Sequence, residues 1–468
     1  MSRHLPPVCP GPQSPLTRRS FLQVGALSAT GLCLSDLLRL REQAQASTGA
    51  TSSPDTAVLL VWLSGGPPHH ETYDLKPDAP DEIRGDFLPI RTNVPGIYVS
   101  EMLPLHAKCA DKYTLIRSIH HEFADHGGGH KRFLTGRRPA QPDGFVNDAP
   151  AVPTIVSKCR EHITRGLPNV IQLTPPGREG VDTFSHGAAY LGPAFNPFIV
   201  GGNPSKENFE VRNLALQPGV ARRLDDRMTM LKGFDRMRRD LDSSGTMDAM
   251  DTYNRRAMEL LTSSAAREAF DLSKEKPELR ARYGNHAWGQ RALLGRRLIE
   301  AGCSFVTVVM ENPAGGGPIP HDALYNWDSH AVNCHIFIDA RWRLPYLDQA
   351  VTALIEDVHA RGLNKKLMVI VTGEFGRSPR IENKDGRPGR DHWPNAMSVL
   401  VAGAVKTGQV IGSTDKDGAH PKDRPLTPND LWATAYQHLG IDYHSAFHDH
   451  QGRPMHILPF GEPIKELV

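Results

Sequence analysis

The chain has 468 residues, with 54 lysine and arginine side chains against 52 aspartate and glutamate side chains, and its hydrophobic fraction is 39%. These values are ordinary for a folded globular protein and exclude a disordered tail or a collagen-like repeat. The net charge of +2 argues against a partner such as nucleic acid, because proteins that bind its phosphates carry a basic surplus.

The N-terminal segment has the layout of an export signal. Residues 17–22 read T-R-R-S-F-L, an apolar run extends from Val24 to Leu34, and residues 44–46 form an A-x-A cleavage site. This order is typical of a twin-arginine signal peptide, and the apolar run is too short to span a bilayer. We expect residues 1–46 to be that signal, with no transmembrane segment, and the protein to be periplasmic or secreted after passing the twin-arginine export machinery. The alternative is an unstructured N-terminus with a chance arginine pair.

Removal of this segment changes the charge and the cysteine count. The remaining chain has 49 basic and 50 acidic side chains, because residues 1–46 hold five basic and two acidic ones. Cys9 and Cys33 leave with the signal, and Cys109, Cys159, Cys303 and Cys334 remain. None of these four belongs to a C-x-x-C pair, so the sequence leaves open either one disulfide or four buried thiols.

Short apolar runs alternate with helical patterns along the rest of the chain. After a linker at 47–56, runs typical of buried strands occur at Ala57–Leu63, Tyr113–Arg117, Asn169–Leu173, Ser304–Met310, Leu367–Val371 and Ser398–Ala402. Helices are predicted at Tyr346–Arg361 and Pro428–Leu439, capped by Gly362 and Gly440. This alternation predicts an α/β fold, a three-layer α/β/α sandwich with a mainly parallel sheet. We expect one domain over 57–468, with a mostly helical insertion at about 205–300.

Polar side chains follow the predicted strands. The first loop contains His69, Glu71 and Asp74, which could bind a metal or belong to a solvated loop. The next contains His126 and His130 around three glycines, which allow close backbone approach to a ligand or form a flexible turn. No G-K-[ST] follows these glycines, which excludes a P-loop.

Three later segments add possible metal ligands. Asp328 and His330 are alternate residues, so in extended chain both can face one ion. Glu374 follows a predicted strand, where α/β proteins place ligand-binding groups, and His392 precedes another strand. Each segment alone fits a surface histidine or a capping acid, but five such segments at the strand ends of one sheet favour a shared site.

These segments together resemble one bacterial exported family, called domain of unknown function 1501, over nearly the whole mature chain. The resemblance rests on W-L-S-G-G-P-P-H-H-E-T-Y-D at 62–74, D-E-I-R-G-D-F at 81–87, N-V-P-G-I at 93–97, H-G-G-G-H at 126–130, W-D-S-H at 327–330, G-E-F-G-R-S-P at 373–379, R-D-H-W-P-N at 390–395, and G-R-P-M followed by G-E-P-I-K-E-L near the C-terminus. The family resembles the alkaline-phosphatase-like superfamily, which includes sulfatases and phosphatases. The resemblance implies an alkaline-phosphatase-like core.

The superfamily resemblance implies positions for several residues. Glu374 takes the place of a metal-binding Asp, and Phe375 replaces the neighbouring His. His392 resembles the late metal-binding His, and Asp328 with His330 resembles the Asp/His pair, although the spacing is D-x-H. The stretch F-L-T-G-R at 133–137 matches the end of the sulfatase signature. Counting back from it places His126 at the nucleophile position and His130 at a conserved Arg, so no Cys or Ser is present to become formylglycine.

One hypothesis is a metal-dependent hydrolase of sulfate or phosphate esters. Its ligands are Asp328, His330, Glu374 and His392 with one of His69, Glu71 or Asp74, a donor set that favours zinc or manganese over calcium. His126 and His130 protonate the leaving group or contact the anion, and Arg377 or Arg390 holds its charged oxygens. The nucleophile stays open between a metal-activated water, Thr72 and His126. A small anionic ester or a sulfated glycan is the expected substrate.

Two alternatives remain. The missing nucleophile and Phe375 favour a binding or scaffold protein that kept the fold and lost the chemistry. A third interpretation treats the histidines as structural, since the chain has 22 of them. His448 and His450 form an H-x-H pair in a polar tail and are predicted to lie on the surface.

Overall fold

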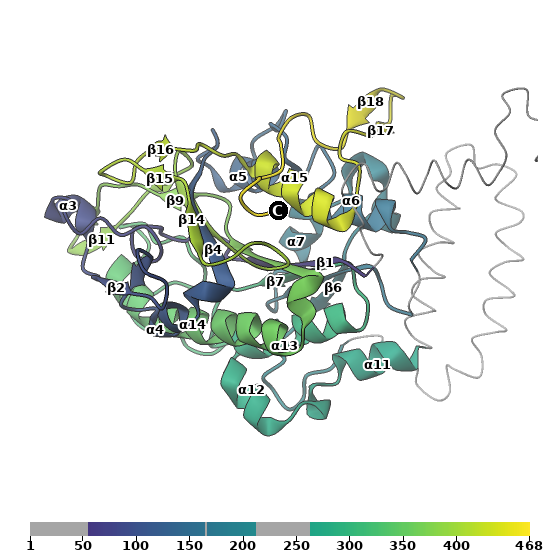
Figure 1. Ribbon diagram of the computed structural model, residues 1–468, viewed down its shortest axis with the longest axis horizontal. Helices are drawn as coiled ribbons and strands as arrows, with labels where there is room; N and C mark the ends of the chain where they lie inside the picture. The colour runs from purple at the N-terminus through teal and green to yellow at the C-terminus, as the bar shows by residue number, and fades with distance from the viewer. Residues whose placement is uncertain (1–54, 164–165, 212–262) are drawn as a thin grey trace, which may run out of the picture. The chain divides into compact units, whose positions relative to one another are not determined.

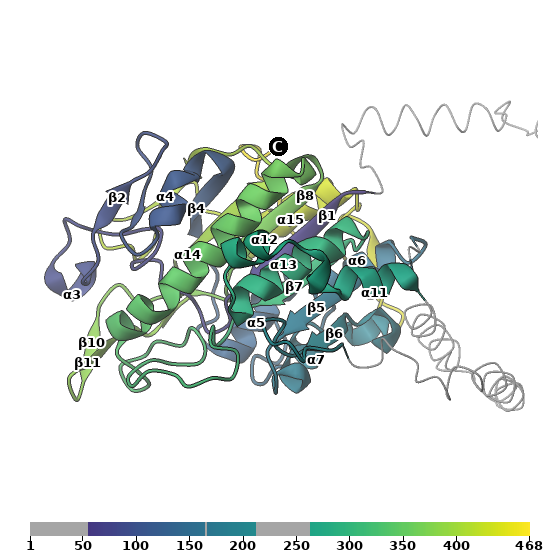
Figure 2. The same ribbon diagram turned by 90° about the horizontal axis from the view of Figure 1, so that it is seen from below.

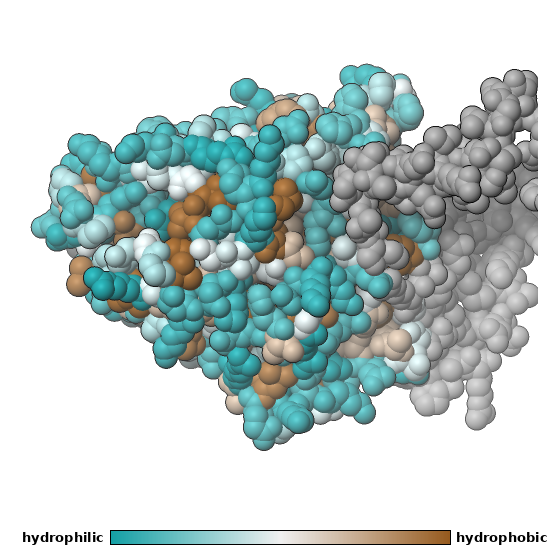
Figure 3. Space-filling model, viewed as in Figure 1, coloured by the Kyte–Doolittle hydropathy of each residue, from teal (hydrophilic) through white to brown (hydrophobic). Residues whose placement is uncertain are grey.

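A computed structural model describes residues 55–163, 166–211 and 263–468 of the chain. The predicted signal peptide and residues 212–262 of the predicted helical insertion lie outside these residues. Within the described ranges, no helix combines the length and apolar character that crossing a bilayer requires. The face shown in Figure 3 is mainly hydrophilic, with patches of hydrophobic residues between polar ones.

An eight-stranded sheet forms the centre of the fold (Figure 1). Its strands, in spatial order, are β14 (Gln409–Ile411), β4 (Tyr113–Ile119), β13 (Met397–Gly403), β8 (Leu367–Thr372), β1 (Ala57–Trp62), β7 (Phe305–Val309), β5 (Val170–Thr174) and β6 (Phe198–Gly201). β13 pairs antiparallel with both of its neighbours, and every other pairing is parallel. The predicted mainly parallel sheet is therefore confirmed, with six strands close to the predicted positions. The sequence analysis missed β6 and β14.

Helices cover both faces of this sheet (Figures 1 and 2). The described α-helices are α3 (Asp81–Arg84), α4 (Pro104–Lys108), α5 (His126–Thr135), α6 (Val152–Cys159), α7 (Glu179–Ser185), α11 (Ser264–Phe270), α12 (Pro277–Tyr283), α13 (Ala287–Glu300), α14 (Ile336–Ala360) and α15 (Pro428–Leu439). Short 3₁₀ helices occupy Ala110–Lys112, Ala189–Leu191, Pro193–Phe195, Leu272–Lys274 and Leu363–Lys365. Five two-stranded ribbons pair β2 (Pro89–Arg91) with β3 (Tyr98–Ser100), β9 (Gly376–Arg377) with β12 (His392–Trp393), β10 (Glu382–Lys384) with β11 (Arg387–Gly389), β15 (Ser413–Thr414) with β16 (Pro421–Asp423), and β17 (Ala446–His448) with β18 (Pro454–His456).

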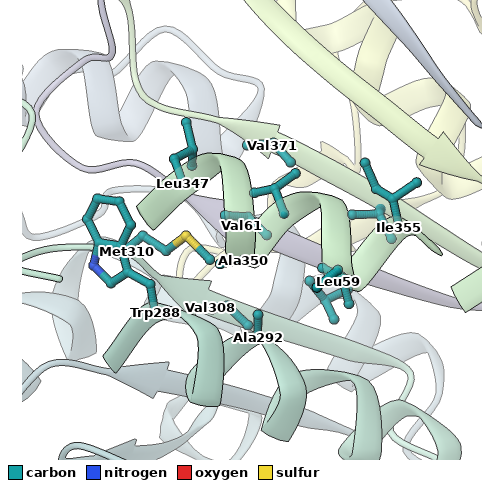
Figure 4. Packing of buried hydrophobic residues seen from close by; sticks show 14 of the residues in the cluster. Leu59, Val61, Trp288, Ala292, Val308, Met310, Leu347, Ala350, Ile355 and Val371 are labelled. Carbon is teal, nitrogen blue, oxygen red and sulfur yellow. The ribbon is translucent and has the colours of Figure 1, made fainter. Parts of the chain in front are cut away.

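The alternation of side chains along each strand divides the core into two layers. Leu59 and Val61 of β1 pack with α13 and α14 on one face, as Figure 4 shows. Leu60 and Trp62 of the same strand pack with α5, α6 and α15 on the other face. The predicted α/β/α sandwich follows directly from strands whose residues are buried on both sides.

The two predicted helices form, but one is longer than predicted. α14 begins at Ile336, ten residues before the predicted start, and continues through Pro345. The predicted helix started directly after this proline. Proline removes one backbone hydrogen bond inside a helix, and the buried face of α14 outweighs that loss. The prediction for α15 is confirmed at both ends, since Asp430 accepts hydrogen bonds from Thr427 at the start and Gly440 adopts a left-handed conformation at the end.

The four cysteines of the described chain are free thiols, three of them buried. The sequence left open one disulfide or four buried thiols. Among the described residues the structure contains no disulfide. In the insertion predicted at 205–300, the described part contains α11, α12 and α13.

Parallel strands bring the loops that follow them to one edge of the sheet. The loops after β1, β4, β5, β7 and β8 all start at this carboxyl edge. Because β13 runs in the opposite direction, the segment that precedes it reaches the same edge. This explains why His392 lies before its strand while the other candidate residues follow theirs.

Candidate metal centre

Asp328 is the centre of a cluster of histidines at the carboxyl edge. Its Oδ1 lies 2.9 Å from His392 Nε2, 3.0 Å from His330 Nε2 and 3.2 Å from His126 Nε2. Arg377 Nη2 donates a hydrogen bond of 2.8 Å to the same oxygen. Burial alone would raise the pKa of Asp328, but these donors hold that pKa well below its usual range. The carboxylate is therefore charged at every physiological pH.

Outer partners fix the orientation of two of these rings. His392 Nδ1 donates to the Ala124 carbonyl at 2.6 Å, and His330 Nδ1 donates to Asp391 Oδ1 at 2.7 Å. A neutral ring that donates through Nδ1 carries a lone pair on Nε2, whereas a protonated ring donates from both nitrogens, and the two Nε2 atoms lie 2.8 Å apart. Burial lowers the pKa of His392 despite the nearby Asp328 carboxylate, which favours this neutral form. Two ring nitrogens and a carboxylate oxygen thus converge, an arrangement that either shared protons or a cation can balance.

Glu374 forms the floor of the cluster. This fully buried carboxylate accepts hydrogen bonds from Gly65 N at 2.9 Å and His126 Nδ1 at 2.8 Å, and its Oε1 lies 3.4 Å from His130 Nε2. Burial opposes its ionisation, but His130 and His126 hold the pKa of Glu374 well below its usual range. A glycine is needed at position 65, because a Cβ there would lie 2.7 Å from the backbone nitrogens of Trp327 and Asp328.

His126 joins the two carboxylates. Burial by itself would lower the pKa of His126, but the hydrogen bonds to Asp328 and Glu374 outweigh this effect and raise the pKa to about 9. The residue opens α5, whose N-cap Asp125 accepts a hydrogen bond from Gly128 N. The glycines of this turn serve protein packing, since a Cβ on Gly129 would lie 2.9 Å from the Phe375 ring. The sequence analysis left open whether these glycines admit a ligand or form a flexible turn.

Phe375 is a wall of the cluster. Its buried ring lies 4.4 Å from the ring of His392 and 5.4 Å from that of His126, measured between centroids. The residue that replaces a ligand histidine in the resemblance thus packs against two imidazoles. The described residues that can hold one ion are His126, Asp328 and His392, whose ligand atoms all lie within 4.8 Å of one another.

The structure does not bring the residues of the first loop into this cluster. Glu71 pairs with Arg390 at 2.7 Å, and His69 Nε2 donates to the Gly418 carbonyl at 2.9 Å. Thr72 is buried and its hydroxyl donates to the Pro68 carbonyl. These contacts anchor the loop to the rest of the protein.

The partners of Asp74 are likewise not histidines of the cluster. It accepts a hydrogen bond from Thr414 and lies 3.1 Å from Lys76 Nζ and 3.8 Å from Arg117 Nε. All four side chains of the loop that were expected to act as ligands or as a nucleophile therefore have structural contacts instead.

The two arginines expected to hold a substrate anion are fully buried. Besides Asp328, the Arg377 guanidinium donates to the carbonyls of Gly65, Gly66, Trp327 and Arg390. Arg390 donates to Glu71 and to the carbonyls of Ile83, Ser378 and Pro379. Both guanidiniums hold loops together, which leaves them no free face toward a substrate.

A different arginine lies beside the cluster and was missed by the sequence analysis. Arg178 follows β5 and donates to Asp182 Oδ1 at 2.8 Å, to Ser64 Oγ at 2.9 Å and to Glu311. Burial raises the pKa of Glu311 to about 7, against the opposing charge of Arg178. The rule that ligand groups follow parallel strands could have found both residues, since each comes just after a predicted strand.

A polar hollow of about 400 Å³ adjoins the cluster. Its lining includes His120, His121, Arg132 and His420. His121 separates the hollow from the cluster, and its Nε2 donates to the Glu374 carbonyl at 2.6 Å.

The fold and this cluster define an α/β protein with a candidate metal centre at the carboxyl edge of its sheet. The chain belongs to the family described as "Protein of unknown function (DUF1501)", which matches residues 55–468. The expected family membership is thereby confirmed. None of the curated proteins compared matches the chain.

Solved structures similar to the chain come from the alkaline-phosphatase and sulfatase superfamily. They include PsFucS1 sulfatase from Pseudoalteromonas sp., with 11% identity, 86% of this chain and 70% of that chain covered, and a TM-score of 0.36. A protein in the alkaline phosphatase superfamily from Vibrio parahaemolyticus has 12% identity, coverages of 82% and 66%, and a TM-score of 0.36. Phosphonate monoester hydrolase SpPMH from Silicibacter pomeroyi has 12% identity, coverages of 88% and 76%, and a TM-score of 0.36. At such identities the likeness concerns the fold alone.

Proposed function

We propose that the protein binds a divalent cation at the Asp328 cluster and hydrolyses sulfate or phosphate esters, including esters on glycans. The observation that carries the proposal is the convergence of two imidazole nitrogens on one carboxylate oxygen. Nε2 of His330 and Nε2 of His392 lie within 3.0 Å of Asp328 Oδ1, and each ring is fixed at Nδ1 by an outer acceptor. Such outer hydrogen bonds are the usual means of orienting metal-binding histidines.

His126, Asp328 and His392 would hold the cation, with His330 and Glu374 beside them. Imidazole nitrogens with carboxylate oxygens suit zinc or manganese better than calcium, which prefers more oxygen ligands. When bound, such an ion polarises an ester oxygen and neutralises charge that develops in the transition state.

The neighbouring residues of the chain would bind and orient the ester. Arg178 keeps its charge, because Asp182 and Glu311 raise its pKa despite burial, and its side chain is 13% exposed. Its three hydrogen bonds to described residues leave part of the five-donor guanidinium for the oxygens of an anion. It therefore takes the function that the sequence analysis gave to Arg377 and Arg390.

The start of α5 would add to the attraction for an anion, since the N-terminal end of a helix carries a partial positive charge. His130 would hold Glu374 in place from the next turn of this helix. The polar hollow lined by His120 and Arg132 has room for the part of a substrate beyond its ester group.

Export by the twin-arginine pathway to the periplasm or beyond is part of the proposal. It rests on the T-R-R-S-F-L segment and the apolar run of the N-terminus. This pathway carries folded proteins, so the protein would acquire its metal before export.

Turnover of small sulfate and phosphate esters by the zinc- and manganese-loaded protein tests the activity. We expect His392→Ala to lose both metal and turnover, while His450→Ala, a matched change at an exposed histidine, keeps both. A protein that binds metal and anionic glycans without turnover would instead be the binding protein that the missing nucleophile favours. A protein that binds neither would refute the metal centre.

A further inference from the structure

Next to the metal centre lies a group of buried polar side chains, several of whose polar atoms have no hydrogen-bond partner among the described residues. Five residues form it: Trp62, His130, Gln172, His186 and Thr307, each no more than 1% exposed. Seven of their side-chain atoms have no partner among the described residues: Trp62 Nε1, His130 Nδ1, both nitrogens of His186, both amide atoms of Gln172, and Thr307 Oγ1. Most other buried polar atoms without a partner in the described chain occur one to a residue.

The five side chains share one face of the sheet. Thr307 of β7 is in register with Gln172 of β5 and with Leu60 of β1. Leu60 and Trp62 point to the same side as Phe305 and Val309, so alternation along the strands places Thr307 and Gln172 there too. The polar atoms of both strands therefore face the helix layer that contains α5 and α7.

Two histidines from those helices complete the cluster. The Trp62 ring lies 5.3 Å from the ring of His130 on α5 and 6.0 Å from that of His186, which follows α7, and both contacts are edge-on. Burial lowers the pKa of His186 to about 3, so the ring is neutral and has one donor and one acceptor nitrogen. His130 faces Glu374 with its other nitrogen, Nε2.

The seven atoms include both hydrogen-bond donors and acceptors, but they form no direct hydrogen bonds with one another. The Trp62 N–H can only donate. Since the Glu374 carboxylate can only accept, His130 Nε2 donates to it, which leaves Nδ1 for a partner on the other side of the ring. Gln172, Thr307 and His186 offer both donors and acceptors. If all seven atoms stayed dry, the total desolvation penalty would rival the folding stability of a whole domain.

We propose that ordered water molecules occupy this cluster and hydrogen-bond to His130 Nδ1, so that Trp62, Gln172, His186 and Thr307 act as positioning residues for the His130–Glu374 contact. Buried waters typically bond two to four polar groups each, and the seven atoms supply enough for several. The inference does not depend on the proposed reaction, because it concerns the hydration and tautomer of the metal-free protein.

Isosteric replacements in the full-length, metal-free chain test the hydration. Thr307→Val and His186→Phe keep the shape and remove the polar atoms, so both should lower the guanidinium midpoint of unfolding by removing water-mediated bonds. Thr307→Ser, which keeps the hydroxyl, should restore most of the loss. Tyr436→Phe is the matched control, since the buried Tyr436 hydroxyl on α15 also lacks a partner but lies outside the cluster. Its midpoint should stay unchanged or rise.

A crystal structure tests whether water is present, and NMR tests which nitrogen of His130 carries the hydrogen. Waters should lie within hydrogen-bond distance of Trp62 Nε1 and His130 Nδ1, and ¹⁵N spectra should show His130 with its hydrogen on Nε2, a preference that His186→Phe weakens. A dry cluster, a midpoint that rises in Thr307→Val as in Tyr436→Phe, or a His130 tautomer unchanged in His186→Phe would each overturn the proposal. If His186→Phe fails to fold, the Thr307 pair and the crystal structure still decide it.

Discussion

Replacing Asp328 with asparagine should weaken the protein in two separable ways. In the metal-free state, the fully buried Arg377 loses the one carboxylate with which it forms an ion pair among the described residues. Breaking a buried ion pair costs about 3–5 kcal/mol. The loss here should be smaller, about 2–3 kcal/mol, because Asp328 is 18% exposed and Arg377 keeps several carbonyl acceptors.

The second effect appears with metal. Free zinc at 1,000 times its dissociation constant stabilises a one-site protein by about 4 kcal/mol. The wild type should show this shift in a guanidinium unfolding experiment, and Asp328→Asn should not. Asp86→Asn is the matched control, since Asp86 is 46% exposed and pairs with Arg341 rather than with the cluster. Its effect without metal should stay below about 1 kcal/mol. An Asp328→Asn protein that unfolds like the wild type and keeps the zinc shift would refute the reasoning.

Three further perturbations test the surroundings of the cluster. Glu311→Gln should change the pH dependence: burial raises the pKa of Glu311 from 4.5 to about 7, so this residue's contribution to stability is full below pH 4.5 and falls by roughly 3 kcal/mol as the pH rises to 7. The difference between wild-type and Glu311→Gln unfolding curves should show that slope, and parallel curves would contradict it. Arg390→Met should cost about 3–5 kcal/mol by leaving Glu71 unpaired in the core, with unchanged metal content, whereas Arg453→Met, at an arginine that is 67% exposed, should change the stability little. His450→Ala should alter neither melting temperature nor metal content, and a loss of metal in that variant would place a ligand in the polar tail.

Much of the fold follows from local patterns. Six of the eight sheet strands are continuous apolar runs, because each is buried on both faces. β6 and β14 escaped prediction since they have four and three residues and only part of each is buried. The predicted start of α14 was ten residues late. Proline inside a helix is unfavourable locally, and the packing of buried residues before it, such as Ile336 and Phe337, cannot be read from local sequence.

The site was only partly predictable for a related reason. Asp328, Glu374 and His392 could be found because strand order sends the adjoining loops to one edge. His69 and Glu71 satisfy the same rule but point elsewhere, since the side chains they contact, such as Arg390, come from distant segments. Sequence spacing places a loop at the site, and only tertiary contacts decide which of its side chains face the centre.

The most direct test of the metal centre is the metal content of the purified protein folded with zinc and manganese present, measured by elemental analysis beside Asp328→Asn and His392→Ala. Because the described residues contain one candidate cluster of ligands, the account predicts about one equivalent of a transition metal in the wild type and none in either variant. A folded wild type without metal that takes up none on titration, or variants that retain the full content, would contradict it.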